Sequence, residues 1–329
     1  MRHSLTILMY HYVRPIAESD FPNIRGLELT DFEGQLDYIE RHYNVVTMAD
    51  VVAQENEGRP LVERPLLLSF DDGYADHYCH VFPALARRKM TGVFFVPGGA
   101  VLDRHMLDVN KIHFLLAATD DREKIIHHIE DTIEGARSEF GLLPLDEYKR
   151  IYWQANRFDS GQDIYIKRML QLGLPEILRN RIVDSLFSRY VSQDVLAFAD
   201  DLYVSEQNLV EMRSAGMEIG SHGYGHYWLD NLNIGEQAID IDRSLEMIER
   251  IGMERHGFYF CYPYGGYTNE TVDLLRARGC SAAVTTRVAI ARLDSKNLLE
   301  LPRLDTNDLP KDRAAPLSPW TEEAIMNNL

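Results

Sequence analysis

The sequence predicts an α/β fold, a barrel of parallel strands joined by helices, with a helical insertion. Three observations support this prediction. Short apolar runs alternate with amphipathic stretches, most of the runs are apolar throughout, and about a hundred consecutive residues lack any strand pattern. The alternation is typical of parallel strands joined by helices, and strands that are apolar throughout are covered on both faces. The length of 329 residues suits one large domain or one domain with an insertion.

The strands and helices are expected to alternate along the chain. The expected strands are Leu5–Tyr12, Val45–Thr47, Leu66–Phe70, Gly92–Val96, Met217–Gly220, Gly257–Cys261 and Ala282–Thr286. Thr30 and Glu33 have the spacing of a capping box that opens a helix to about His42. Further helices are expected at Ala75–Lys89, from the cap Ser205 to Gly216, at Asn233–Ile251 and from the cap Thr268 to Gly279.

The stretch without strands divides the chain into parts. Residues 101–201 show apolar spacing of three and four, for example in Ile125–Ile133 and Ile177–Tyr190, so we expect a helical insertion there. The barrel is then residues 1–100 and 202–310. The Pro-rich tail, 311–329, is expected on the surface, with no element before Thr321. The alternative is that 101–201 is only an elaborated crossover. An insertion is expected to narrow the mouth of the site and to set substrate choice.

Composition excludes several kinds of partner. The formal charge is −17 and no basic stripe is present, which argues against nucleic acid and, more weakly, against an anionic membrane surface. Three cysteines without a close pair indicate neither a disulfide framework nor a thiolate zinc site. The sequence shows no signal peptide and no apolar run long enough to span a membrane, so we expect a cytoplasmic protein.

Polar clusters follow four of the expected strands. They are His11, Asp71-Asp72-Gly73, His222 to His226, and Tyr262 to Gly266. In barrels of parallel strands the active site gathers at the carboxyl ends of the strands. Four clusters at the same end therefore indicate a catalytic site there.

Two of these clusters have the composition of a metal site. Adjacent residues that leave a strand point in different directions, so Asp72 can bind a cation while Asp71 faces the substrate. Gly73 permits a sharp turn. His222 and His226 are four residues apart and can converge on one ion. Taken alone, Asp-Asp-Gly is a common turn and two of twelve histidines can pair by chance. Together they form an open site of two imidazoles and one carboxylate, which leaves room for water.

The motifs resemble those of the polysaccharide deacetylases with the NodB homology domain. Ser69–Gly73 resembles the family motif Thr-Phe-Asp-Asp-Gly, His222–His226 resembles His-(Ser/Thr)-x-x-His, and Cys261–Tyr264 resembles Arg-x-Pro-Tyr. The resemblance covers about 1–100 and 202–305.

The resemblance implies a distorted (β/α)7-type barrel and a function for each matching residue. Asp71 would be the catalytic base, and Asp72, His222 and His226 would hold one divalent ion, most often Zn²⁺, with Co²⁺, Mn²⁺ or Ni²⁺ as alternatives. The backbone N–H of Tyr264 would help to bind the oxyanion. The reaction would remove acetyl from an N-acetylated sugar.

Two positions depart from the family pattern. Gly223 stands where Ser or Thr is usual, which loosens the expected orientation of the histidine loop. Cys261 stands where an arginine usually orients the base, and we hypothesise that Arg303 supplies that guanidinium from the last strand. The alternative for Arg303 is a surface salt bridge.

The general acid must also come from an unusual place. The late Leu-x-His motif of the family is absent, because no histidine follows His256. Leu8-Met9-Tyr10-His11 resembles the N-terminal Tyr-His of a subgroup that includes the deacetylases of poly-N-acetylglucosamine export, so His11 is the expected acid. Its alternative is a buried, hydrogen-bonded histidine at a strand end. Tyr224, Trp228 and Tyr264 could stack on a sugar or pack in the core.

The expected substrate is an N-acetylated sugar, glycan or sugar nucleotide, in the synthesis of a surface polysaccharide of O-antigen or capsule type. Two other functions stay open. One is hydrolysis of a small amide or cyclic ureide, as in allantoinase-like relatives of this fold. The other is metal or carbohydrate binding without turnover.

Overall fold

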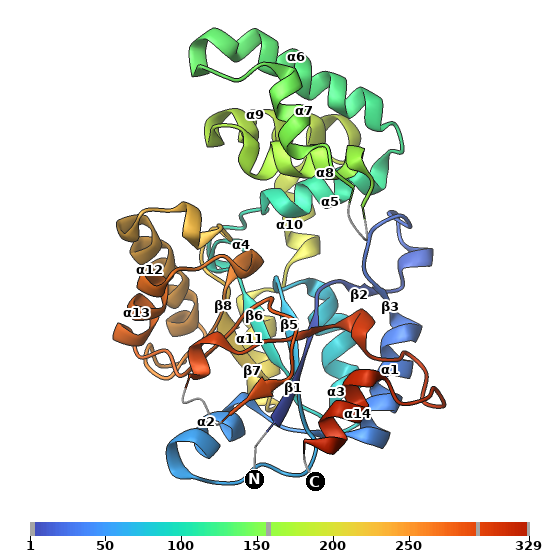
Figure 1. Cartoon of the computed structure of the whole chain (residues 1–329), viewed down its shortest axis with the longest axis vertical. Helices are drawn as coiled ribbons and strands as arrows, with labels where there is room; N and C mark the ends of the chain where they lie inside the picture. Colours follow the sequence, from blue (N-terminus) through green and yellow to red (C-terminus); the bar gives the residue numbers. More distant parts are fainter. Residues whose placement is uncertain (1–3, 156–158, 294–296, 328–329) are drawn as a thin grey trace. The chain divides into compact units, whose positions relative to one another are not determined.

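The sheet is mostly parallel and curls into a distorted barrel, which confirms the predicted fold class (Figure 1). The computed structural model describes residues 4–155, 159–293 and 297–327. Its strands are β1 (Ser4–Tyr10), β2 (Val13–Arg14), β3 (Leu27–Glu28), β4 (Asn44–Val45), β5 (Pro65–Asp71), β6 (Val93–Val96), β7 (Glu218–Ser221), β8 (Tyr259–Cys261), β9 (Ala282–Val284), β10 (Ala291–Arg292) and β11 (Leu304–Asp305).

The strand order brings distant parts of the chain together. Neighbours in the order β1-β5-β6-β7-β8-β9 are all parallel, and β11 adds to β1, also in parallel. A bridge between Val284 and Leu301 links β9 to the chain that leads into β11. The segment 301–303 therefore lies between β9 and β1.

The pleat of β5 decides where its last residue points. Leu66, Leu68 and Phe70 belong to the large core, whereas Leu67 belongs to a separate cluster with residues of the neighbouring strands. Side chains alternate with a period of two along a strand. Asp71 therefore lies on the same face of β5 as Leu67.

Helices flank this sheet. They are α1 (Leu29–His42), α2 (Met48–Glu57), α3 (Phe82–Arg87), α4 (Gly98–Leu102), α11 (Glu206–Ser214), α12 (Ile234–Arg250), α13 (Asn269–Ala277) and α14 (Pro319–Met326). In Figure 1, α12 and α13 lie on one side of the strands and α1, α3 and α14 on the other. Ser205, Asn233 and Thr268 each close a capping box, so these three predicted helix starts are confirmed.

Two predicted helices differ from those observed. The capping box at Thr30 is wrong, because β3 runs directly into α1 at Leu29 and the Glu28 side chain accepts the first N–H. The helix expected at Ala75–Lys89 contains a π-helical stretch, His77–Val81, before α3.

The tail is not a purely surface segment, which corrects the prediction for 311–329. Thr321 of α14 is fully buried, and its hydroxyl forms hydrogen bonds with the hydroxyls of Tyr38 at 2.9 Å and Tyr43 at 3.0 Å. These two tyrosines provide polar partners inside an otherwise apolar core, and this explains why a polar residue of the tail is buried there.

The second compact unit is helical. It comprises residues 16–25 and 106–198, so 16–25 group with the helices and not, as predicted, with the barrel. The contact of Phe21 with Phe114 and Phe198 explains this grouping. Its helices are α5 (Asp108–Ala118), α6 (Arg122–Phe140), α7 (Leu145–Tyr152), α8 (Gly161–Arg168) and α9 (Glu176–Tyr190), and α10 (Val195–Leu202) begins in it. None of the helices in the described ranges is long and apolar enough to cross a membrane.

Candidate active site

The structure brings together the residues that the motifs singled out. Asp72, His222 and His226 each offer a ligand atom, and these atoms lie within 4.8 Å of one another. All three side chains are buried. Nε2 of His222 is 3.5 Å and Nε2 of His226 is 3.2 Å from Oδ1 of Asp72. The sequence spacing thus corresponds to one compact donor set.

The donor set fits a divalent cation. Oδ1 of Asp72 is buried and has no hydrogen-bond partner among the described residues, whereas Oδ2 accepts a bond from the Tyr74 hydroxyl at 2.5 Å. Nδ1 of His222 donates to the carbonyl of Cys261 at 2.8 Å, so a neutral His222 turns a lone pair at Nε2 toward Asp72. Two facing lone pairs repel each other unless a cation or a proton lies between them. Two imidazoles and a carboxylate are a common set for zinc and similar ions.

Asp72 stays ionised in this setting. Burial raises the pKa of its carboxyl, but the neighbouring imidazoles of His222 and His226 outweigh burial and hold the pKa well below its usual value. The group is therefore a carboxylate, the form that binds a metal.

Three residues of this site have a strained backbone. Asp72, His226 and Tyr264 have φ values of 75°, 55° and 57°. Non-glycine residues rarely adopt positive φ, and such strain gathers at functional sites. Gly73, as predicted, makes the turn with φ of 65°, and a Cβ on it would lie 2.7 Å from a methyl group of Val96.

Asp71 lies beside the candidate ligand set and pairs with Arg303. The guanidinium of Arg303 donates to Oδ1 of Asp71 at 2.8 Å and to Oδ2 at 2.7 Å, and both residues are almost completely buried. Burial raises the pKa of Asp71, but the charge and hydrogen bonds of Arg303 outweigh burial and lower the pKa to about 2. Asp71 is therefore ionised, and Arg303 is not the surface residue of the alternative interpretation.

Cys261 and Ser69 help to hold Arg303 in place. The guanidinium lies 3.1 Å from the sulfur of Cys261 and 3.2 Å from the hydroxyl of Ser69, and it donates to the carbonyl of Thr285 at 2.9 Å. Asp71, His222 and Cys261 also lie close enough to hold an ion. Because Arg303 occupies both oxygens of Asp71, this second set is the poorer cation site.

His11 reaches Asp71 from the end of β1. Its Nε2 is 4.0 Å from Oδ2 of Asp71, and its side chain is 44% exposed. His11 is therefore not the buried histidine of the alternative interpretation, although it does lie at the end of a strand. Its backbone carbonyl accepts a hydrogen bond from Nε2 of the buried His77 at 2.9 Å. His77 lies within the helix expected at Ala75–Lys89, and only the fold reveals this link to His11.

The aromatic residues divide into two groups. Tyr264 stacks on Trp228 with ring centroids 3.5 Å apart and meets the ring of His226 edge-on. Tyr224 is engaged elsewhere, because the guanidinium of Arg243 lies 3.6 Å from its ring centre and its hydroxyl binds Asp103. Tyr224 therefore packs in the protein, and stacking on a substrate stays possible only for Tyr264 and Trp228.

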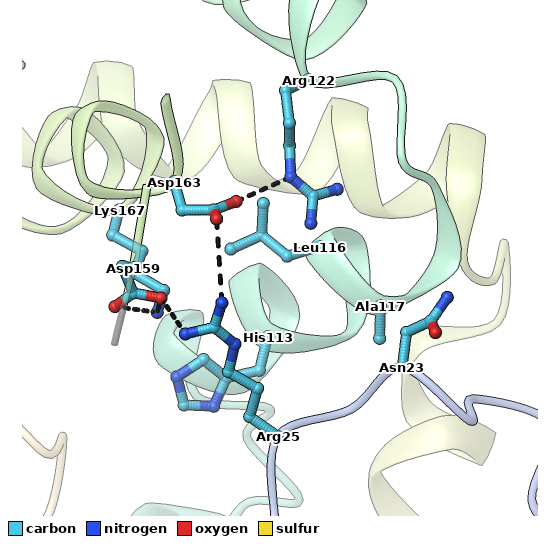
Figure 2. Close-up of a pocket in the computed structure, with 9 residues that line it drawn as sticks. All are labelled: Asn23, Arg25, His113, Leu116, Ala117, Arg122, Asp159, Asp163 and Lys167. Atoms are coloured by element: carbon cyan, nitrogen blue, oxygen red, sulfur yellow. Dashed lines mark hydrogen bonds and ion pairs between the residues drawn. The ribbon is translucent and has the colours of Figure 1, made fainter. Parts of the chain in front are cut away.

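The helical unit contains a charged cavity of about 60 Å³ (Figure 2). Its lining residues are Asn23, Arg25, His113, Leu116, Ala117, Arg122, Asp159, Asp163 and Lys167. Asp159 pairs with Lys167 and Arg25, and Asp163 pairs with Arg122 at 2.7 Å and with Arg25 at 3.8 Å. Each carboxylate thus lies between two cations. The cluster ties the segment with Arg25 to α8, and we assign it a structural role.

Comparison with known proteins agrees with the motifs. A family model described as polysaccharide deacetylase matches residues 185–283. YxkH of Bacillus subtilis, provisionally named a polysaccharide deacetylase, is 26% identical over 104 residues. That match covers 31% of this chain and about a third (35%) of the relative.

Similar solved structures extend the likeness in fold to the rest of the chain. The deacetylase PplD of Streptococcus pyogenes, in complex with acetate, has a TM-score of 0.59 and 14% identity, with 95% of this chain and 97% of that chain covered. IcaB of Ammonifex degensii has a TM-score of 0.54, 20% identity and coverage of 99% and 97%. A de-N-acetylase of Aggregatibacter actinomycetemcomitans has a TM-score of 0.55, 18% identity and coverage of 99% and 100%.

These identities show likeness in fold alone, whereas the family match is one of sequence. The predicted resemblance is confirmed: the chain is related to the polysaccharide deacetylases by sequence over residues 185–283 and by fold over nearly its whole length.

Proposed function

We propose that this chain is a metal-dependent N-deacetylase that hydrolyses the acetamide of an N-acetylated sugar. The observation that carries the proposal is the buried set of Asp72, His222 and His226, with an oxygen of Asp72 that lacks a hydrogen-bond partner among the described residues. The family match and the solved deacetylases of the same fold support it.

The residues around this set have complementary tasks. A divalent ion held there would polarise the acetamide carbonyl and lower the pKa of a bound water toward about 7. Asp71 lies next to Asp72 in sequence and is ionised, so it can accept the proton that the water loses during attack. Because its pKa is low, Asp71 would be a weak base.

Other groups stabilise the developing charges. The backbone N–H of Tyr264, at the strained turn after β8, would donate to the oxyanion. His11 would protonate the leaving amine. Arg303 touches Asp71 and not the ligand set, so it is a positioning residue that keeps the carboxylate ionised and fixed. Acetate and a free amino sugar would be the products.

A panel of substrates tests the proposal. N-acetylglucosamine oligomers, N-acetylated nucleotide sugars and small cyclic ureides are incubated with the purified chain, and acetate and ammonia are measured. We expect acetate from at least one N-acetyl sugar and no ammonia from the ureides. Ammonia release without acetate would favour the small-amide hydrolase, and neither product would favour binding without turnover.

The same panel addresses the finer predictions. Activity on nucleotide sugars would support a role in precursor synthesis for a surface polysaccharide, whereas activity on oligomers alone would support a polymeric substrate. The cytoplasmic location stays a prediction, which fractionation of cells would test.

A further inference from the structure

A buried carboxylate lies against the loop that bears both histidines. Asp240 of α12 accepts the N–H of Tyr224 at 3.0 Å through Oδ2 and the N–H of Gly225 at 2.8 Å through Oδ1. Asp240 is 5% exposed. A buried charge is costly unless its oxygens are hydrogen-bonded. The two peptide groups between His222 and His226 provide these bonds.

The carbonyl groups of the same loop are also bound. The N–H of Gly98 donates to the carbonyl of Gly223 at 2.8 Å, and the N–H of Gly99 donates to the carbonyl of Tyr224 at 3.0 Å. Asp240 thus binds the N–H groups of the loop, and the start of α4 binds its carbonyl groups. Such clamping explains how His226 keeps its φ of 55°, a conformation that a histidine rarely adopts.

The carboxylate of Asp240 occupies the space that a side chain at position 223 would need. Gly223 has φ of 69°, and a Cβ on it would lie 2.7 Å from Oδ2 of Asp240. A side chain at position 223 would therefore displace the carboxylate. The glycine that seemed to loosen the loop is the residue that lets Asp240 reach it.

We propose that Asp240 is a positioning residue that fixes the loop from His222 to His226 and thereby sets the affinity of the chain for a divalent ion. Its contacts are with the backbone between the two histidines, so it acts through the placement of their rings. This inference rests on the proposed metal site and adds to it a residue outside the three sequence motifs.

The first test compares two neighbouring carboxylates on α12. In Asp240→Asn one acceptor oxygen becomes an amide that faces a backbone N–H, so one hydrogen bond is lost and a repulsive contact is created. We expect affinity for Zn²⁺, measured by competition with a chromophoric chelator, to fall by about tenfold to a hundredfold. The control is Asp242→Asn, whose carboxylate binds Arg278 and not the loop. It should bind Zn²⁺ as the wild type does.

The second test is a double-mutant cycle between positions 223 and 240. Gly223→Ser and Asp240→Ala should each weaken Zn²⁺ binding, but the double variant should bind better than the sum of the two losses predicts, because the serine fills the space that the carboxylate leaves. Strain at φ of 69° is present in both serine variants and cancels in the cycle. If Asp240→Asn does not fold, Gly223→Ser still tests the claim, because it leaves Asp240 in the chain.

The outcomes separate this inference from the proposed function. Wild-type affinity in Asp240→Asn, or strictly additive losses in the cycle, would overturn the role of Asp240 while the metal site stands. A wild-type chain that binds no divalent ion would overturn both.

Discussion

Arg303 and Asp71 form a two-pronged ion pair between the segment that precedes β11 and the end of β5, with N–O distances of 2.8 and 2.7 Å. The two residues are 232 positions apart in sequence. Because both are almost completely buried, neither charge has water to replace its partner. The pair therefore determines both the ionisation and the direction of the proposed base.

Replacement of Arg303 by Met should lower activity and shift its pH dependence. Without the guanidinium, burial is opposed only by the smaller effects of His222 and His11, so the pKa of Asp71 rises from about 2. Asp71 then becomes protonated at higher pH, so the acid limb of the kcat/KM profile should move to higher pH. At neutral pH we expect a loss of about tenfold to a hundredfold, as for other residues that orient a reacting group.

Two controls accompany this profile. Arg303→Lys keeps a charge but not the planar fork, so it should shift the limb less than Met does. Arg287→Met removes a guanidinium that is exposed and donates to a carbonyl, and its profile should match the wild type. If Arg303→Met shows a cooperative thermal unfolding transition but its acid limb is not shifted, Arg303 does not control the ionisation of Asp71.

The variant Asp71→Asn should keep the ion and lose turnover. The amide has nearly the same shape but cannot accept the proton, and general-base catalysis contributes about a hundredfold to ten-thousandfold. Metal content and acetate release are measured on the same preparation. Full activity in Asp71→Asn would show that another group acts as the base.

The variant His11→Ala should lose more activity on an N-acetyl sugar than on an activated phenyl ester. Protonation of an amine leaving group needs an acid, whereas an activated phenyl ester leaves without one. We therefore expect a loss of about a hundredfold or more on an N-acetyl sugar and a much smaller loss on the ester. His80→Ala serves as the control from outside the proposed site. Equal losses on both substrates would argue for a structural role of His11.

The buried hydroxyl of Thr321 should be important for stability. Thr321→Val keeps the shape but leaves Tyr38 and Tyr43 without this partner. The free energy of unfolding, measured by urea titration, should fall by about 1–3 kcal/mol. Glu322→Gln on the neighbouring, exposed position should change it little. A Thr321→Val variant as stable as the wild type would mean that α14 contributes little to the core.

Local sequence patterns were sufficient to predict the fold class and most of its strands and helices. Uniformly apolar runs such as that of β5 and capping residues such as Asn233 are signals within a few residues, and the barrel class and three of the helix starts followed from them. The proximity of Asp72 to the two histidines was also predictable, because these residues stand at strand ends that a parallel sheet brings together.

Contacts over long sequence distances could not be read in the same way. Asp240 looks like one more polar residue of an amphipathic helix, and only the packing of α12 shows that its oxygens meet the histidine loop. In the sequence His77 looks like an ordinary helix residue, and only the fold shows that its Nε2 is hydrogen-bonded to the carbonyl of His11. The burial of α14 depends on two tyrosines that lie about 280 positions earlier.

The most direct test of the account is acetate release from the best N-acetyl sugar of the panel by chelator-treated protein, before and after Zn²⁺ is added back. The wild type should be inactive after treatment and recover with Zn²⁺, and Asp72→Asn should stay inactive in both states because the ion has lost a ligand. If the metal-stripped chain, verified by elemental analysis, released acetate at the untreated rate, the proposed metal-dependent mechanism would be contradicted.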